Sequence, residues 1–166
     1  MIMANSSTYR LVFGIIIGVG LSFFSVYFFN MVDLLDQIEA HVGTNFIKAL
    51  AIAVGSNFRF DFVSVLTGTP TTLGFFVPQI IIWIVLCYFC GTIAKGTKRG
   101  AMASFLVIVI VFVIWIMLSI FSQVDLMAMF SGNQLFFTLG GLGVSLVGGL
   151  AGGTVGGTIS GPFEGI

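Results

Sequence analysis

Four long apolar runs, separated by shorter polar stretches, set the pattern of this chain. They cover roughly residues 10–31, 73–94, 101–123 and 134–160, and each is long enough to cross about 30 Å of hydrocarbon, which takes around 20 helical residues. A bilayer forces backbone groups to hydrogen-bond within their own segment, so each run is expected to be an α-helix. The first run exceeds the core of a signal peptide, and we expect it to be retained. The predicted fold is an all-α integral membrane protein, a four-transmembrane-helix bundle that forms one domain over residues 1–166.

The polar stretch between the first two runs has its own periodicity. Six apolar residues share one helical face of residues 32–56: Leu35, Ile38, Val42, Phe46, Ala49 and Ala53. The continuous apolar part is too short to cross a bilayer, so we predict one amphipathic interfacial helix lying on the membrane surface. The alternative is that this stripe packs on a neighbouring subunit. The whole external segment covers residues 32–72.

Phenylalanines alternate with charged residues just after this predicted helix, at Phe58, Phe60 and Phe62. A period of two is typical of extended backbone. We expect this part of the loop to dip into the membrane interface. The Gly-Thr-Pro sequence at 68–70 then predicts a turn into the second span.

Small residues form two rows along the last apolar run. One row reads Gly141, Ser145, Gly149, Gly153 and Gly157, and the other reads Gly148, Gly152 and Gly156. Residues four apart lie on one ridge of a helix. Ridges without side chains let other backbones approach closely, as in the small-xxx-small packing of membrane helices. The last run is therefore predicted to dock tightly against other helices.

A shorter row of the same kind lies in the first run, at Gly14, Gly18 and Ser22. We predict that this row packs against the glycine-rich last run, because small residues on both sides allow the closest approach. One partner helix covers one ridge, and the second ridge would then be free to bind another protein. The two sets of small residues make up the predicted helix-packing interface.

Charge is scarce and balanced. Charged residues make up 7% of the chain, against about 25% in soluble domains, and six basic residues match six acidic ones. This excludes a sizeable soluble domain and a basic surface for nucleic acid. Lys95, Lys98 and Arg99 form a cluster between the second and third runs, and the positive-inside rule places it, with both termini, in the cytoplasm of a cell-membrane protein. The same three side chains are candidates to contact anionic lipid headgroups.

Candidate catalytic or ligand-binding groups are few. His41 is the only histidine, with Glu39 two residues before it, and its surroundings match no metal-ligand motif. Cys87 and Cys90 form a C-x-x-C pair inside an apolar run, where cysteines usually pack as small hydrophobes. The centres of the four runs have no ionisable residue, the usual mark of an ion or proton pathway. We expect no metal, no cofactor and no enzymatic activity.

The function that follows from these features is structural. We expect a non-catalytic accessory subunit of a larger membrane complex, which packs against partner helices through its glycine-rich faces. Its partners would be membrane lipids and other integral membrane subunits, or further copies of itself. One alternative is a homo-oligomeric channel or small-solute pore, with glycine ridges on its packing faces. A less favoured alternative is a membrane-embedded lipid-modifying enzyme that uses His41 and the outer acidic residues.

Overall fold

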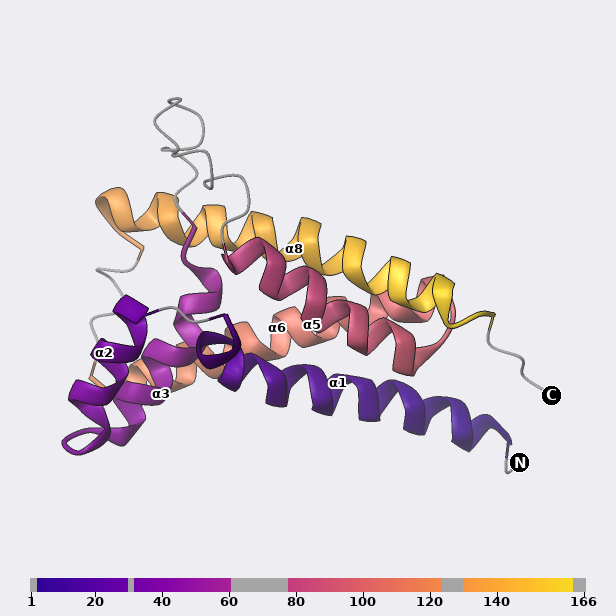
Figure 1. Cartoon of the computed structure of the whole chain (residues 1–166), viewed down its shortest axis with the longest axis horizontal. Helices are drawn as coiled ribbons and strands as arrows, with labels where there is room; N and C mark the ends of the chain where they lie inside the picture. Colours follow the sequence, from indigo (N-terminus) through magenta and orange to yellow (C-terminus); the bar gives the residue numbers. More distant parts are fainter. Residues whose placement is uncertain (1–2, 30–31, 61–77, 124–129, 163–166) are drawn as a thin grey trace.

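Four long helices lie side by side and build the body of the protein (Figure 1). The computed structural model describes residues 3–29, 32–60, 78–123 and 130–162, and all regular structure within these ranges is helical. The four helices are α1 (Met3–Phe28), α5 (Pro78–Ala94), α6 (Thr97–Phe121) and α8 (Gly132–Ile159). Their positions agree with the four apolar runs to within a few residues at most ends, while α1 begins a full two turns earlier than expected.

The long helices alternate in direction. α1 begins and α8 ends at one end of the bundle, which we call the basal end, and the short helices α2 and α3 lie at the opposite, distal end (Figure 1). At the basal end α5 and α6 are joined by Lys95 and Gly96, whose φ angles are 52° and 88°. This left-handed pair reverses the chain within two residues, a conformation that glycine adopts without strain. α5 and α6 therefore form an antiparallel hairpin.

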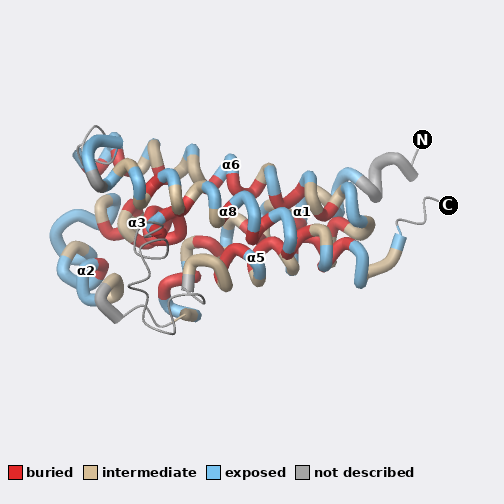
Figure 2. The backbone as a smooth tube through the Cα atoms, turned by 90° about the horizontal axis from the view of Figure 1, so that it is seen from above, coloured by how far each residue is buried: buried red, intermediate tan, exposed pale blue. Residues whose placement is uncertain are grey.

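Three of the helices contain stretches long and apolar enough to cross a membrane: Thr8–Phe28, Thr97–Phe121 and Gln134–Ile159. Buried residues gather where the helices face one another, while the outer faces are exposed (Figure 2). Those outer faces carry large apolar side chains such as Phe13, Ile16 and Phe105, as expected for a surface that lipid covers. α5 has 17 residues and spans only about 26 Å. The protein is thus all-helical with three candidate membrane spans, and a fourth span at α5 stays a prediction.

The predicted amphipathic helix is two helices, α2 (Val32–Val42) and α3 (Phe46–Gly55). The break falls at residues 43–45, where the Asn45 side chain accepts a hydrogen bond from the Lys48 backbone N–H at 3.0 Å. This is the usual capping of a new helix N-terminus. α3 packs on α1 and α6 and buries Ala49 and Ala53 within the chain. Ile38, Ala49 and Ala53 of the apolar stripe are therefore covered by the protein's own helices, whereas Val42 and Phe46 keep 48% and 61% of their surface exposed. For the exposed part of the stripe, contact with the membrane surface or with another subunit stays a prediction.

The segment after α3 enters the bundle instead of extending along its surface. Phe58 ends a short 3₁₀ helix, η1 (Ser56–Phe58), and is fully buried. Its ring centroid lies 5.3 Å from that of Trp83, 5.4 Å from that of Phe112 and 5.6 Å from that of Trp115. The prediction of an interfacial extended loop is wrong for Phe58, because three aromatic rings offer it a complete apolar site. Phe62 and the predicted turn at 68–70 lie outside the described residues.

The buried side chain of Asn57 helps to hold η1 inside the bundle. Asn57 is fully buried, its Nδ2 donates to the Ser22 carbonyl at 3.0 Å, and the Ser25 hydroxyl donates to its Oδ1 at 2.7 Å. The Trp83 indole N–H donates to the Asn57 carbonyl at 2.8 Å. Irregular backbone is tolerated deep in a membrane protein when such bonds satisfy it. α1 and α5 thus hold η1 in place by hydrogen bonds as well as by packing.

Candidate functional site: an apolar groove beside the glycine-rich helix

The first ridge of α8 faces α6 and the distal segment. A Cβ atom at Gly149 would lie 2.6 Å from Ile108 Cδ1, and one at Gly157 would lie 2.6 Å from the Gly96 carbonyl oxygen. Gly153 is equally close to α6: its Cβ would meet the backbone and a side chain there. Ser145, on the same ridge, is fully buried and donates its hydroxyl to the Leu142 carbonyl at 2.8 Å. This ridge is filled by the protein itself.

One position on that ridge explains how η1 fits. A Cβ at Gly141 would collide with the Phe58 carbonyl group, so only glycine lets the two backbones pass at this distance. Two residues after Phe58, the backbone N–H of Phe60 donates a hydrogen bond to the Phe137 carbonyl of α8 at 3.2 Å. The predicted packing role of Gly141 is therefore directed at the chain's own distal segment.

The second ridge of α8 faces α5. Cβ atoms at Gly152 and Gly156 would collide with the carbonyl oxygens of Ile84 and Tyr88, and one at Gly148 would lie 3.5 Å from the carbonyl oxygen of Ile80. Each step of four residues on α8 matches a step of four on α5, so the two helices run parallel. Parallel helices four residues in step can keep a glycine ridge against one backbone over several turns.

The predicted pairing of the first run with the last is wrong. A Cβ at Gly14 would lie 3.1 Å from the Cys90 carbonyl oxygen, one at Gly18 would lie 2.9 Å from Val107 Cγ2, and the Ser22 carbonyl binds Asn57. All three small residues of α1 therefore contact α5, α6 or the distal segment. α5 lies between α1 and α8 (Figure 1). Neither α8 ridge is free, because α5 covers one while α6 and η1 cover the other.

The basic cluster lies at the basal end. Lys98 and Arg99 line a hollow of about 510 Å³ together with Gly157 and Thr158 of α8. Lys95 belongs to the left-handed turn and is not among the residues that line this hollow. Lys98 and Arg99 fall in the first turn of α6, where the helix dipole disfavours cations. Their position is thus not explained by helix stability, and contact with anionic headgroups stays a prediction.

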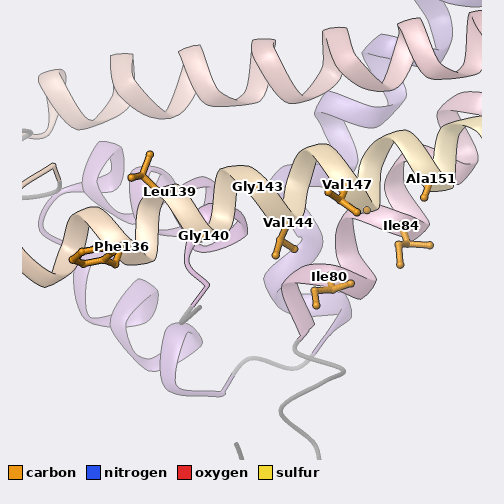
Figure 3. Close-up of a pocket in the computed structure, with 10 residues that line it drawn as sticks. Ile80, Ile84, Phe136, Leu139, Gly140, Gly143, Val144, Val147 and Ala151 are labelled. Atoms are coloured by element: carbon orange, nitrogen blue, oxygen red, sulfur yellow. The ribbon is translucent and has the colours of Figure 1, made fainter. Parts of the chain in front are cut away.

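An apolar groove remains between α5 and the exposed side of α8 (Figure 3). Its volume is about 590 Å³, and we call it the α5–α8 groove. It is lined by Ile80 and Ile84 of α5 and, on α8, by Phe136, Leu139, Gly140, Gly143, Val144, Val147, Gly148 and Ala151. None of these side chains is charged or polar. The described lining therefore favours an apolar occupant.

Gly143 distinguishes this groove from an ordinary lipid-facing surface. It is exposed, and a Cβ built on it would find no described atom within 4 Å outside the neighbouring backbone of α8 itself. Val147, one turn further along, keeps 74% of its surface exposed. A glycine in a membrane helix lets another backbone come close, and nothing among the described residues makes use of that here. The sequence does carry a signal for this face, since Gly143, Val147 and Ala151 are spaced by four, but the two glycine-richer rows obscured it.

A second apolar groove, of about 560 Å³, lies between α1 and α5. Its lining includes Ile17, Leu21, Phe28 and Phe89 and no glycine. Large flexible side chains suit acyl chains, whereas close helix packing favours small residues. The two grooves flank α5 and differ in this respect, because only the α5–α8 groove has glycines among its lining residues.

The remaining candidate groups are dispersed. Cys87 and Cys90 are free thiols buried in the core, where they face α8 and α1. His41 lines a distal cavity with Lys48 and Arg59, while Glu39 is not among the residues that line it. In the described ranges, no three His, Cys, Asp or Glu side chains lie close enough to share a metal ion. The chain matches no protein family profile, no curated protein and no solved structure.

Proposed function

We propose that the protein is a non-catalytic subunit of a membrane complex and binds a transmembrane helix of a partner in the α5–α8 groove. The observation that carries this proposal is the exposed glycine of a groove that is otherwise wholly apolar. The partner helix would contribute apolar side chains and would bring its backbone close to α8 at Gly143. The two glycine-rich ridges do not support the proposal, because the chain's own helices cover both.

The proposal includes α5 as a fourth span. Its 17 residues are at the short end of the range for a spanning helix, and they contain no charged side chain. α5 runs parallel to α8 and antiparallel to α1 and α6, as the fourth member of an alternating bundle must. In this arrangement Lys95, Lys98 and Arg99 lie in the cytoplasm, where they can contact anionic headgroups, and both termini lie on the same side.

A helix in the groove suits its dimensions. Gly143 and Ala151 are two turns apart on α8 and so lie about 12 Å from each other along the axis. A partner that contacts both must follow α8 for at least that distance, as two helices packed in parallel or antiparallel fashion do. Association of helices in lipid depends on such close contact, because burial of apolar surface gives no advantage there. Complex formation should therefore be sensitive to a single added side chain.

The test is Gly143→Leu, with Gly20→Leu as the matched control. Both glycines are exposed residues of candidate membrane-spanning helices, and at neither would a Cβ lie within 4 Å of a described atom beyond the helix's own backbone. Leucine fits the isolated chain at both sites but fills the groove only at 143. We expect the native mass of the complex, purified in mild detergent, to fall to that of the free chain for Gly143→Leu and to stay unchanged for Gly20→Leu.

A photo-crosslinker at Val147 provides the second readout, with Val155 as its control. Both side chains are exposed on α8, but only Val147 lines the groove. A protein adduct at 147, with lipid alone at 155, would agree with the proposal, and the adduct mass would show whether the partner is another copy. The proposal is wrong if the wild-type chain is a stable monomer and the crosslinker at 147 reacts only with lipid.

The described bundle gives less support to a pore. Its centre is filled by side chains without exposed surface, among them Cys87, Cys90, Val107 and Val111. A conducting path would have to form between copies of the chain. Solute or ion flux in liposomes containing the purified protein would revive that alternative.

A further inference from the structure

A small polar cavity lies at the distal end, away from the α5–α8 groove. Its volume is about 300 Å³, and four polar side chains line it, Gln37, His41, Lys48 and Arg59, together with Trp115. They come from α2, α3, the residue after η1 and α6. Four separate segments of the chain thus direct polar or aromatic groups to one place.

The lining offers hydrogen-bond donors and positive charge. Lys48, Arg59 and the Trp115 indole can only donate hydrogen bonds, while the Gln37 amide and the His41 ring can donate as well as accept them. Among the residues that the structure describes, no acidic one lines the cavity. Within the described ranges neither Lys48 nor Arg59 pairs with a carboxylate. Two cations without a counter-charge in one cavity favour an anionic ligand.

Small residues of α3 keep the cavity open, and an aromatic stack closes its base. Ala51 and Gly55, one turn apart on α3, both line it. A Cβ at Gly55 would collide with the Trp115 indole nitrogen. On its other side the Trp115 ring stacks on Phe58 at an interplanar angle of 21°. Packed rings therefore hold this part of the cavity wall, while Arg59 is exposed and Lys48 is half-buried.

We propose that this cavity binds a phosphate group. The planar guanidinium of Arg59 can hold two phosphate oxygens at once, and Lys48 supplies a point charge beside it. A volume of about 300 Å³ is at the lower limit for ligand pockets and suits a headgroup or a free phosphate better than a nucleotide. Trp115 lies about 9 Å from the end of α6 at Phe121, a depth that a lipid phosphate can reach. The phosphate belongs either to an anionic lipid or to a free ion.

Binding is measured on the purified full chain in two settings. In the first setting, the protein in phosphate-free buffer and nonionic detergent is titrated with inorganic phosphate in a calorimeter. A titration with chloride at equal ionic strength is the control. In nanodiscs, phosphatidylglycerol is compared with phosphatidylcholine by the ³¹P signal of the bound lipid. Each setting uses Lys48→Gln and Arg59→Gln, with Arg10→Gln as the control, because Arg10 is an exposed cation of α1 that lines neither the distal cavity nor the basal hollow. Lys48→Arg keeps the charge and should retain binding.

Saturable binding of one phosphate in detergent would identify a free ion as the ligand, and binding confined to phosphatidylglycerol nanodiscs would identify a lipid headgroup. In either case we expect Lys48→Gln and Arg59→Gln to weaken binding about tenfold or more and Arg10→Gln to leave it unchanged. Circular dichroism checks that the variants fold. The proposal is wrong if neither setting shows saturable binding, or if both glutamine variants bind as the wild type does.

Discussion

The contact between α8 and α5 can be tested by adding one methyl group. In Gly152→Ala the new Cβ would collide with the Ile84 carbonyl oxygen and would lie 3.0 Å from both Ile84 C and Cα. In Gly143→Ala the same methyl group would enter open space on the opposite side of the same helix. The pair separates the effect of α5 packing from every general effect of alanine in α8.

The size of the effect follows from the distances. Carbon atoms pack best at about 3.5–4.0 Å, so α5 must retreat by about 0.5–1 Å, and atoms around it would lose a quarter to a half of their attraction. α5 has little room to retreat, because Cys90 already lies against Gly18 of α1 and Gly91 lies against Gly100 of α6. Overpacking of this kind destabilises a core by about 1–3 kcal/mol. The helix preference of alanine offsets little of it, since membrane helices stay formed when they separate.

The assay is unfolding of the purified chain in mild detergent by added sodium dodecyl sulfate. Trp83 and Trp115 are both buried in the bundle, so their fluorescence reports helix separation. We expect Gly152→Ala to lower the free energy of unfolding by about 1–3 kcal/mol and Gly143→Ala to change it by less than about 0.5 kcal/mol. Equal shifts for the two variants would refute the placement of α5 on this ridge.

Two further predictions concern the interior of the bundle. In Asn57→Ala the partners Ser22 and Ser25 lose a buried hydrogen-bonding group, so we expect the free energy of unfolding to fall by about 1–3 kcal/mol. A double-mutant cycle with Ser25→Ala should show a coupling energy of about 0.5 kcal/mol or more. Additive effects of the two substitutions would contradict the hydrogen bond between Ser25 and Asn57. Cys87 and Cys90 have no exposed surface, so a maleimide should label them only after the chain unfolds. Mass spectrometry measures the labelling, and rapid labelling of the native chain would show that α5 is not packed as described.

The long helices could be predicted from the sequence because hydropathy and length alone decide them. α5 begins at Pro78, as expected for a residue without an N–H at a helix start. The short link at residues 95–96 allows only a tight antiparallel hairpin. These features depend on neighbours in the chain and on the bilayer, and no distant contact is needed to establish them.

The distal segment could not be predicted because distant contacts decide it. The alternation at Phe58 and Phe60 indicates an extended strand, yet Phe58 is buried by Trp83 and Trp115, which lie on other helices. From the sequence alone, Asn57 is expected in an exposed loop, but its side chain is buried and donates a hydrogen bond to the Ser22 carbonyl. Local periodicity contains no information about either partner, so the sequence indicates an interfacial loop where the protein has a buried turn.

The glycine rows indicate close packing but not its partner. Any backbone fits a bare ridge, so Gly14 and Gly18 appeared to be suitable partners for α8, although they contact α5 and α6. The partner is decided by which helices the bundle places side by side. That arrangement depends on the parallel register of α5 with α8, which no short-range pattern in the sequence encodes.

The glycines of α8 therefore serve two purposes that a substitution can tell apart. Gly141, Gly152 and Gly153 lie against backbone of the same chain, so a larger residue there disturbs the fold and every function that depends on it. Gly143 contacts nothing described, so a larger residue there leaves the fold intact and changes only what approaches from outside. If Gly143→Leu lowers the mass of the native complex while its unfolding in detergent stays that of the wild type, the effect must arise at the groove. A parallel loss of stability would instead show that residue 143 is packed within the chain, and the proposed binding surface would then have no basis.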